Sequence, residues 1–212
     1  WQANNNSGST IYEIESSTGV DTAYGVIYTG YGLSYTHSAL TPNVTYYYKV
    51  RARNLDTVYS GYTGAITTHT ICNTPGNISF TTVAETAINL TWGTNNNSAS
   101  TVYTLKSSSE TNTNYQTIYS GPNNSFSHSS LTPNVTYYYK VYATNLDNIS
   151  TNYNTPNSTH TRCNVPANLV FTSVNETSIS VQWEANNNSG STIYELYSSS
   201  ETDTNFSLLL ST

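Results

Sequence analysis

An eleven-residue string, LTPNVTYYYKV, occurs twice in the chain without one changed residue, at Leu40–Val50 and at Leu131–Val141. The two copies lie 91 positions apart, and the same spacing separates three similar blocks that begin at Trp1, Trp92 and Trp183. Self-similarity at a fixed spacing is the signature of a chain built from repeated structural units. The sequence therefore predicts several copies of one unit rather than a single large fold.

The spacing also sets the expected boundaries of the units. Cys72 and Cys163 are 91 positions apart and begin the second and third copies. We expect a complete repeat at 72–162, a partial repeat at 1–71 without its N-terminal strands, and a partial repeat at 163–212 without its C-terminal strands. We expect the polypeptide to continue at both ends; the alternative is that successive chains complement each other head to tail.

The complete repeat has the hydrophobic pattern of short β-strands. Apolar residues alternate with polar ones, with turn residues between the segments, which is typical of strands and not of helices. The chain is rich in Tyr, Thr, Val and Ile, which suit a half-buried pleated surface and argue against disorder. About seven such segments in about 90 residues predict an antiparallel β-sandwich.

One pattern in the complete repeat resembles a known family. The residues that carry it are Leu131, Pro133, Tyr137, Tyr139, Val141 and Ala143, and they are similar to the tyrosine corner and the following strand of fibronectin type III domains. Trp92 matches the core tryptophan of that family, and Pro75 and Pro166 stand where the family often carries proline. The resemblance implies tandem immunoglobulin-like, seven-stranded antiparallel sandwiches, as in bacterial extracellular and surface proteins.

The repeated positions predict the core. The expected core residues are Trp1, Trp92, Trp183, Tyr46, Tyr137, Leu40, Leu131, Val50 and Val141. The rings of Tyr46 and Tyr137 should be buried while their hydroxyls bond the backbone at the corner. Tyr47 and Tyr138 should face outward, because successive residues of a strand point to opposite faces.

Composition and motifs argue against several function classes. Six Lys and Arg residues and a net charge of −6 cannot neutralise a phosphate backbone, so nucleic acid is not an expected partner. No run of 18 apolar residues exists, so no membrane insertion is expected within this segment. No zinc spacing, phosphate-binding glycine loop or acidic calcium loop occurs.

The four histidines do not indicate an enzyme. His37 and His128 are 91 positions apart, as are His69 and His160, and structural residues recur in this way. A catalytic constellation would not be expected in each repeat. We predict no catalytic residue, no metal ligand and no cofactor.

Two residue types are candidates for covalent chemistry. Asn43, Asn77 and Asn134 begin Asn-X-Ser/Thr sequons and are candidate glycosylation sites in a glycoprotein. Cys72 and Cys163 fall at the expected joints between sandwiches. Head-to-tail stacking would keep them much farther apart than the roughly 4.4–6.8 Å between Cα atoms that a disulfide needs. They are therefore expected to be shielded thiols, to bridge separate chains or to be modified.

The repeats predict a structural or adhesive module of a long extracellular or cell-surface protein, such as a stalk, filament or fibre. Its expected partners are neighbouring repeats or other copies of itself. The loops after the second and sixth strands, NNNS and NLD, emerge at one end of the unit and are a candidate surface for a carbohydrate or cell-surface ligand. The alternative is a non-catalytic spacer in a secreted polysaccharide-degrading enzyme, and a third class is a receptor ectodomain.

Overall fold

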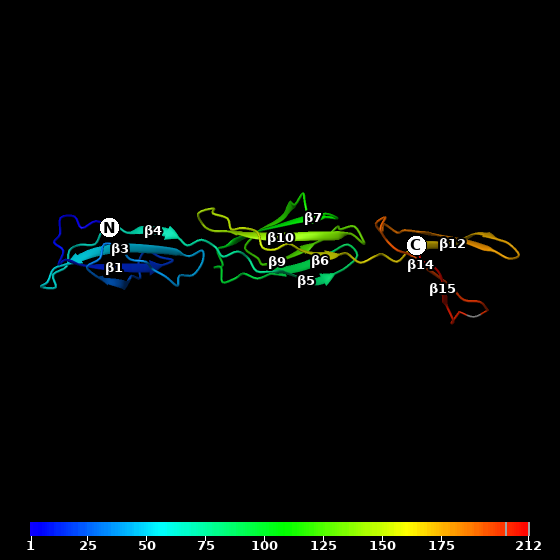
Figure 1. Cartoon of the computed structure of the whole chain (residues 1–212), viewed down its shortest axis with the longest axis horizontal. Helices are drawn as coiled ribbons and strands as arrows, with labels where there is room; N and C mark the ends of the chain where they lie inside the picture. The colour runs from blue at the N-terminus through cyan, green and yellow to red at the C-terminus, as the bar shows by residue number, and fades with distance from the viewer. Residues whose placement is uncertain (202, 212) are drawn as a thin grey trace.

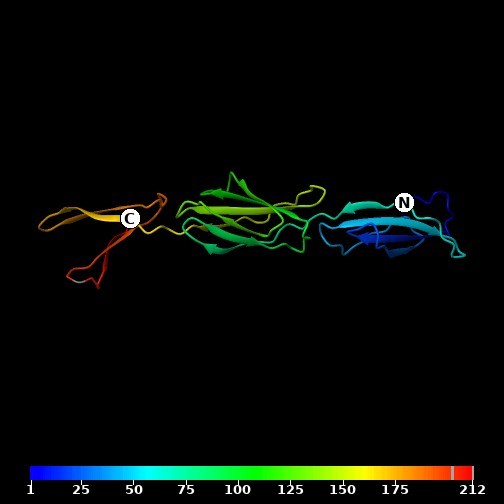
Figure 2. The same cartoon turned by 180° about the vertical axis from the view of Figure 1, so that it is seen from behind.

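The computed structural model describes residues 1–201 and 203–211, and within them every regular element is a β-strand. The strands lie in three groups that follow one another along a single long axis (Figure 1), and the view from behind shows the same order (Figure 2). All strand pairs are antiparallel. The expected all-β class with separate units in tandem is confirmed.

The middle group contains two sheets. Its strands are β5 (Ile78–Val83), β6 (Ile88–Trp92), β7 (Val102–Ser109), β8 (Gln116–Gly121), β9 (Ser125–His128), β10 (Thr136–Thr144) and β11 (Asn157–His160). One sheet has the order β11-β10-β7-β8 and the other has the order β5-β6-β9. The two sheets enclose one hydrophobic core, as in a β-sandwich.

Alternation along the strands fills this core. Ile88, Leu90 and Trp92 of β6 are almost fully buried, whereas the residues between them are half-buried. Along β10, buried and half-buried residues alternate from Tyr137 to Thr144. The ring of Trp92 meets that of Tyr103 edge-on, with centroids 5.9 Å apart. Each sheet thus presents every second side chain to the other, as the two-residue period of a strand requires.

The tyrosine corner takes the same form in two groups. The backbone N–H of Thr132 donates to the hydroxyl of Tyr137 at 3.0 Å, and that of Thr41 donates to the hydroxyl of Tyr46 at 3.0 Å. Both rings are buried. A buried ring is compatible with its polar hydroxyl because the corner backbone supplies the hydrogen bond.

The first group is a single sheet. Its strands are β1 (Ile11–Thr18), β2 (Gly25–Gly30), β3 (Thr45–Arg53) and β4 (Ile66–His69), in the order β2-β1-β3-β4. This order matches β8-β7-β10-β11, but residues 1–71 form no counterpart of β5 and β6. Trp1, Leu40 and Val50, expected in the core, are therefore only partly covered, and Trp1 is 37% exposed.

The third group consists of two separate hairpins. β12 (Ala167–Val174) pairs with β13 (Ile179–Glu184), and β14 (Glu195–Ser198) pairs with β15 (Ser207–Ser211). Trp183, also expected in the core, is only half-buried because no second sheet covers β13 among the described residues. Large apolar side chains such as Phe171, at 71% exposure, lie open to solvent.

Candidate functional site

The described residues contain no group of three or more His, Cys, Asp or Glu side chains that could hold a metal ion. Nor does this part of the chain include a helix long and apolar enough to cross a bilayer.

His128 forms a hydrogen bond with the hydroxyl of Tyr139 at 3.0 Å, and His37 forms one with the hydroxyl of Tyr48 at 3.2 Å. Both histidines pack edge-on against tyrosine rings. Burial lowers the pKa of His128.

The contact between the first and middle groups, hereafter the joint, is held by a set of side-chain hydrogen bonds. At its centre lies Asn43, which has no exposed surface. Its Nδ2 donates to Thr101 Oγ1 at 3.0 Å and to Ser100 Oγ at 3.3 Å. Its Oδ1 accepts the backbone N–H of Leu146 at 3.0 Å. A side chain of the first group thus satisfies polar groups on two loops of the middle group.

The backbone around Asn43 also takes part. Ser98 Oγ donates to the carbonyl oxygen of Asn43 at 2.7 Å, and the Ser98 N–H donates to that of Pro42 at 3.3 Å. Asn43 has a φ of 53°, in the left-handed region that asparagine tolerates better than most residues. Asparagine suits this position for two reasons: it tolerates the left-handed backbone conformation, and its side-chain amide can both donate and accept hydrogen bonds.

Two further contacts cross the joint at its rim. His69 Nδ1 lies 2.9 Å from Asp147 Oδ1, and Asn145 Nδ2 donates to the carbonyl oxygen of Thr70 at 3.4 Å. The NLD loop that carries Asn145 and Asp147 and the NNNS loop that carries Ser98 therefore both face the preceding group. The structure places the two candidate ligand loops of the middle group in the joint, where they contact the first group.

An asparagine ladder stiffens the segment that enters the middle group. Asn73 and Asn97 exchange side-chain to backbone hydrogen bonds at 2.7 and 2.8 Å, and Asn95 Nδ2 donates to the carbonyl oxygen of Thr74 at 2.9 Å. Since each bond joins the entering segment to the NNNS loop, the ladder fixes the path of the chain as it leaves the joint.

The same arrangement recurs 91 residues further on. Asn134 Nδ2 donates to Thr192 Oγ1 at 2.8 Å, and Ser189 Oγ donates to the carbonyl oxygen of Asn134 at 2.7 Å. Asn164 and Asn188 repeat the ladder at 2.7 and 2.9 Å. The joint is therefore a property of the repeat and not of one pair of groups.

The sequon asparagines differ in exposure. Asn77 is exposed, Asn134 is half-buried, and Asn43 is fully buried with its Nδ2 occupied by two hydrogen bonds. N-glycosylation attaches the glycan to that same nitrogen. The closed joint has no room for a glycan on Asn43.

Both cysteines are free thiols, and they lie in different environments. Cys72 is buried in the joint, with Sγ 4.0 Å from Thr101 Oγ1, and burial raises the pKa of its thiol. Cys163 is exposed.

The remaining core residues expected from the sequence lie in the middle group, where Leu131, Tyr137 and Val141 are buried.

Two lysines on the outer face of the long sheets lie between aromatic rings. Lys49 Nζ lies 3.9 Å from the ring centroid of Tyr24 and 4.2 Å from that of Tyr62. Lys140 takes the equivalent place, 4.0 Å from Tyr115 and 4.3 Å from Tyr153. These ring faces are already occupied, so a sugar that stacked on them would have to displace a lysine.

No protein-family model matches the sequence, and no curated protein matches it significantly. Among solved structures, the chain is similar to a segment of two fibronectin type III domains from chicken tenascin, with a TM-score of 0.50 and 14% identity over 71% of this chain and 84% of that one. It also matches the FN1–FN3 domains of chicken CNTN1, with a TM-score of 0.39 and 16% identity over 73% of this chain. The chain spans 56% of that CNTN1 segment. The tenascin likeness shows that the chain has the fibronectin type III fold.

Proposed function

We propose that the chain is a structural or adhesive module of a long extracellular or cell-surface repeat protein, in which units at 1–71, 72–162 and 163–212 are coupled into a stiff rod. The observation that carries the proposal is the joint at Asn43, which recurs at Asn134. A flexible tether between independent domains would need no buried hydrogen bonds. The resemblance of the sequence to fibronectin type III domains supports the extracellular placement.

The chemistry of the joint suits a stalk. Its bonds are short-range and mostly neutral, and those of the Asn43 side chain are buried or partly buried, so salt screens them little. Each repeat carries both halves of the joint: the Asn43 or Asn134 end, and a socket of Ser and Thr hydroxyls. Units of this kind can be added without limit, and every contact has the same geometry. Such stacking produces a quasi-linear array.

Solution scattering tests the stiffness of the rod. Profiles of the 212-residue chain, extrapolated to zero concentration, should fit one extended shape. The Asn43→Gly variant keeps the left-handed backbone and removes the amide, and its profiles should require a distribution of bent shapes. Asn114→Gly is the matched control, because Asn114 also has a φ of 53° but lies exposed between β7 and β8. A flexible parent chain would contradict the proposal.

A further inference from the structure

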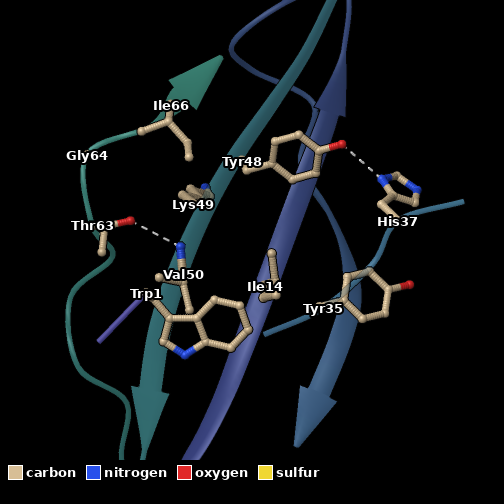
Figure 3. A pocket seen from close by; sticks show the side chains of 10 residues that line it. All are labelled: Trp1, Ile14, Tyr35, His37, Tyr48, Lys49, Val50, Thr63, Gly64 and Ile66. Atoms are coloured by element: carbon tan, nitrogen blue, oxygen red, sulfur yellow. Dashed lines mark hydrogen bonds between the residues drawn. The ribbon is translucent and has the colours of Figure 1, made fainter. Parts of the chain in front are cut away.

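The outer face of the longer sheet carries different charges in the middle and first groups. In the middle group, Lys106 of β7 lies directly opposite Lys140 of β10. The residues 91 positions earlier are Glu15 of β1 and Lys49 of β3 (Figure 3), which lie opposite each other in the same register. They form an ion pair, with Lys49 Nζ 3.1 Å from Glu15 Oε2. The middle group thus has two like charges where the first group has an ion pair.

No carboxylate neutralises the two lysines of the middle group. Residues 72–162 contain three acidic residues, Glu85, Glu110 and Asp147. Within the described part of the chain, neither lysine forms an ion pair, and Asp147 is engaged in the joint. Like charges directly opposite each other on neighbouring strands are destabilising. An anion bound between the two ammonium groups would therefore stabilise the folded sheet.

Aromatic rings position one of these ammonium groups without cancelling its charge. Lys140 Nζ lies between Tyr115 and Tyr153, 4.0 Å and 4.3 Å from their ring centroids. Tyr153 is in turn met edge-on by Tyr142, with centroids 5.1 Å apart. The rings attract the cation but carry no net charge, and they restrict the freedom of its long side chain. A ligand therefore meets a partly ordered cation that is still available to pair with an anion.

Tyr138 adds an aromatic surface beside the lysines. It lies two residues before Lys140 on β10, so both side chains point to the outer face. Its side chain is half-buried, and its ring pairs with no other ring or cation of residues 1–201 and 203–211. A free ring next to two cations suits a sugar that carries a carboxylate. The apolar side of the sugar can pack on the ring while the carboxylate meets the ammonium groups.

We infer that the outer face formed by Lys106, Tyr138 and Lys140 binds a carboxylated sugar of an acidic polysaccharide. An inorganic anion would use the lysines and leave the ring uncovered, and a nucleic acid would need more cations than this face offers. The chain as a whole has a net charge of −6, so a polyanion is repelled from most of its surface. The inference goes beyond the proposed function, because it requires a folded middle group but no stiff joint.

Calorimetric titration of the 212-residue chain with a trimer of galacturonate tests the site. At low ionic strength we expect one trimer per chain, since the equivalent lysine of the first group is already neutralised by Glu15. Binding should weaken as salt is added. The fully methyl-esterified trimer, which has no charge, should bind at least about tenfold more weakly. A parent chain that binds no trimer, or that binds the ester equally well, would overturn the inference.

Other anions decide whether the face recognises a sugar. A trimer of glutamate carries the same number of side-chain carboxylates on a peptide, and inorganic phosphate carries charge alone. Both should bind more weakly than the galacturonate trimer, because neither offers a sugar ring to Tyr138. Equal or tighter binding of either one would assign the face to a different anion and would also overturn the inference.

Lys106→Glu tests the charge by introducing the residue that the first group has as Glu15. It should weaken binding of the galacturonate trimer at least about tenfold. Without ligand, this variant should melt at a higher temperature than the parent, because an ion pair replaces two like charges. Arg162→Glu is the matched control, since it makes the same change in net charge at an exposed residue outside the strands of this face. Equal losses of binding in the two variants, or no rise in melting temperature, would contradict the inference.

Tyr138→Ala tests the aromatic part of the site. It should weaken binding of the trimer about three- to tenfold. Tyr47→Ala is the matched control, because Tyr47 occupies the same outward position in the first group, and this variant should bind as the parent does. Circular dichroism verifies that each variant keeps its β-content. Equal effects of the two substitutions would show that Tyr138 does not contact the sugar and would overturn the inference.

Discussion

Removing the amide of Asn43 should open the joint locally without unfolding either group. Asn43→Gly keeps the left-handed backbone and deletes three hydrogen bonds, at 3.0, 3.0 and 3.3 Å. It leaves the buried Thr101 hydroxyl and the Leu146 N–H without these partners. A buried polar group left unpaired costs about 1–3 kcal/mol. The Thr101 hydroxyl is buried and the Leu146 N–H is partly buried, so the two together, partly rehydrated, predict a loss of about 2–4 kcal/mol in the free energy of joint opening.

The hydrogen-exchange rate of the Leu146 backbone amide measures this change in the free energy of joint opening, because the Leu146 N–H donates to Asn43 Oδ1. At about 1.4 kcal/mol per factor of ten, protection should fall by about 30- to 1,000-fold, provided that exchange occurs through opening of the joint. The Ile149 amide is the internal control, because it donates to Asn145 Oδ1 at 2.8 Å within the same loop. Unchanged protection at Leu146, or an equal fall at Ile149, would refute the reasoning.

Three further predictions concern the core, the pH response and modification. Trp92→Ala should destabilise the middle group by about 3–5 kcal/mol in denaturant melts, whereas Trp1→Ala, at a half-open site, should cost far less; equal costs would contradict the difference in burial. Burial lowers the pKa of His128, so the unfolded chain binds its proton more readily. The contribution of His128 to the free energy of unfolding should be fully present above the ordinary pKa of about 6.5 and should be lost as the pH falls through the pKa of His128 in the folded chain. Melts that show no such loss, or that show the same loss in His128→Phe, would contradict this. In a host that glycosylates secreted proteins, glycopeptide mass spectrometry should find glycan at Asn77 and none at Asn43; glycan on Asn43 of chains with a closed joint would contradict its burial.

Much of the fold could be predicted because the repeat spacing and strand alternation are local signals. Tyr137 and Trp92 fall where a fibronectin type III core requires them, and each can be recognised within a few residues of sequence. Residues 34–37 show the limit of this reasoning. Their sequence, SYTH, matches the strand SFSH of β9, yet they form no strand, because strand structure depends on a neighbour that residues 1–71 do not supply.

The joint could not be predicted in the same way. Asn43 opens a glycosylation sequon, and NNNS and NLD contain residues common in turns, so each has an ordinary local interpretation. Their shared role appears only when residues more than 50 positions apart are brought together in space. One signal was available: the string around Asn43 is repeated unchanged, although strand residues alone would tolerate exchange among similar side chains.

The central claim, that the joint fixes one unit against the next, is tested most directly by a distance across it. Spin labels at Thr29→Cys and Ser120→Cys occupy equivalent exposed positions on β2 and β8, in a chain whose native cysteines are replaced by serine and which is diluted in unlabelled chain. Pulsed dipolar spectroscopy should give one narrow distance distribution for the parent and for Asn114→Gly, and a broad one for Asn43→Gly. A broad distribution in the parent, or a narrow one that survives Asn43→Gly, would contradict the account.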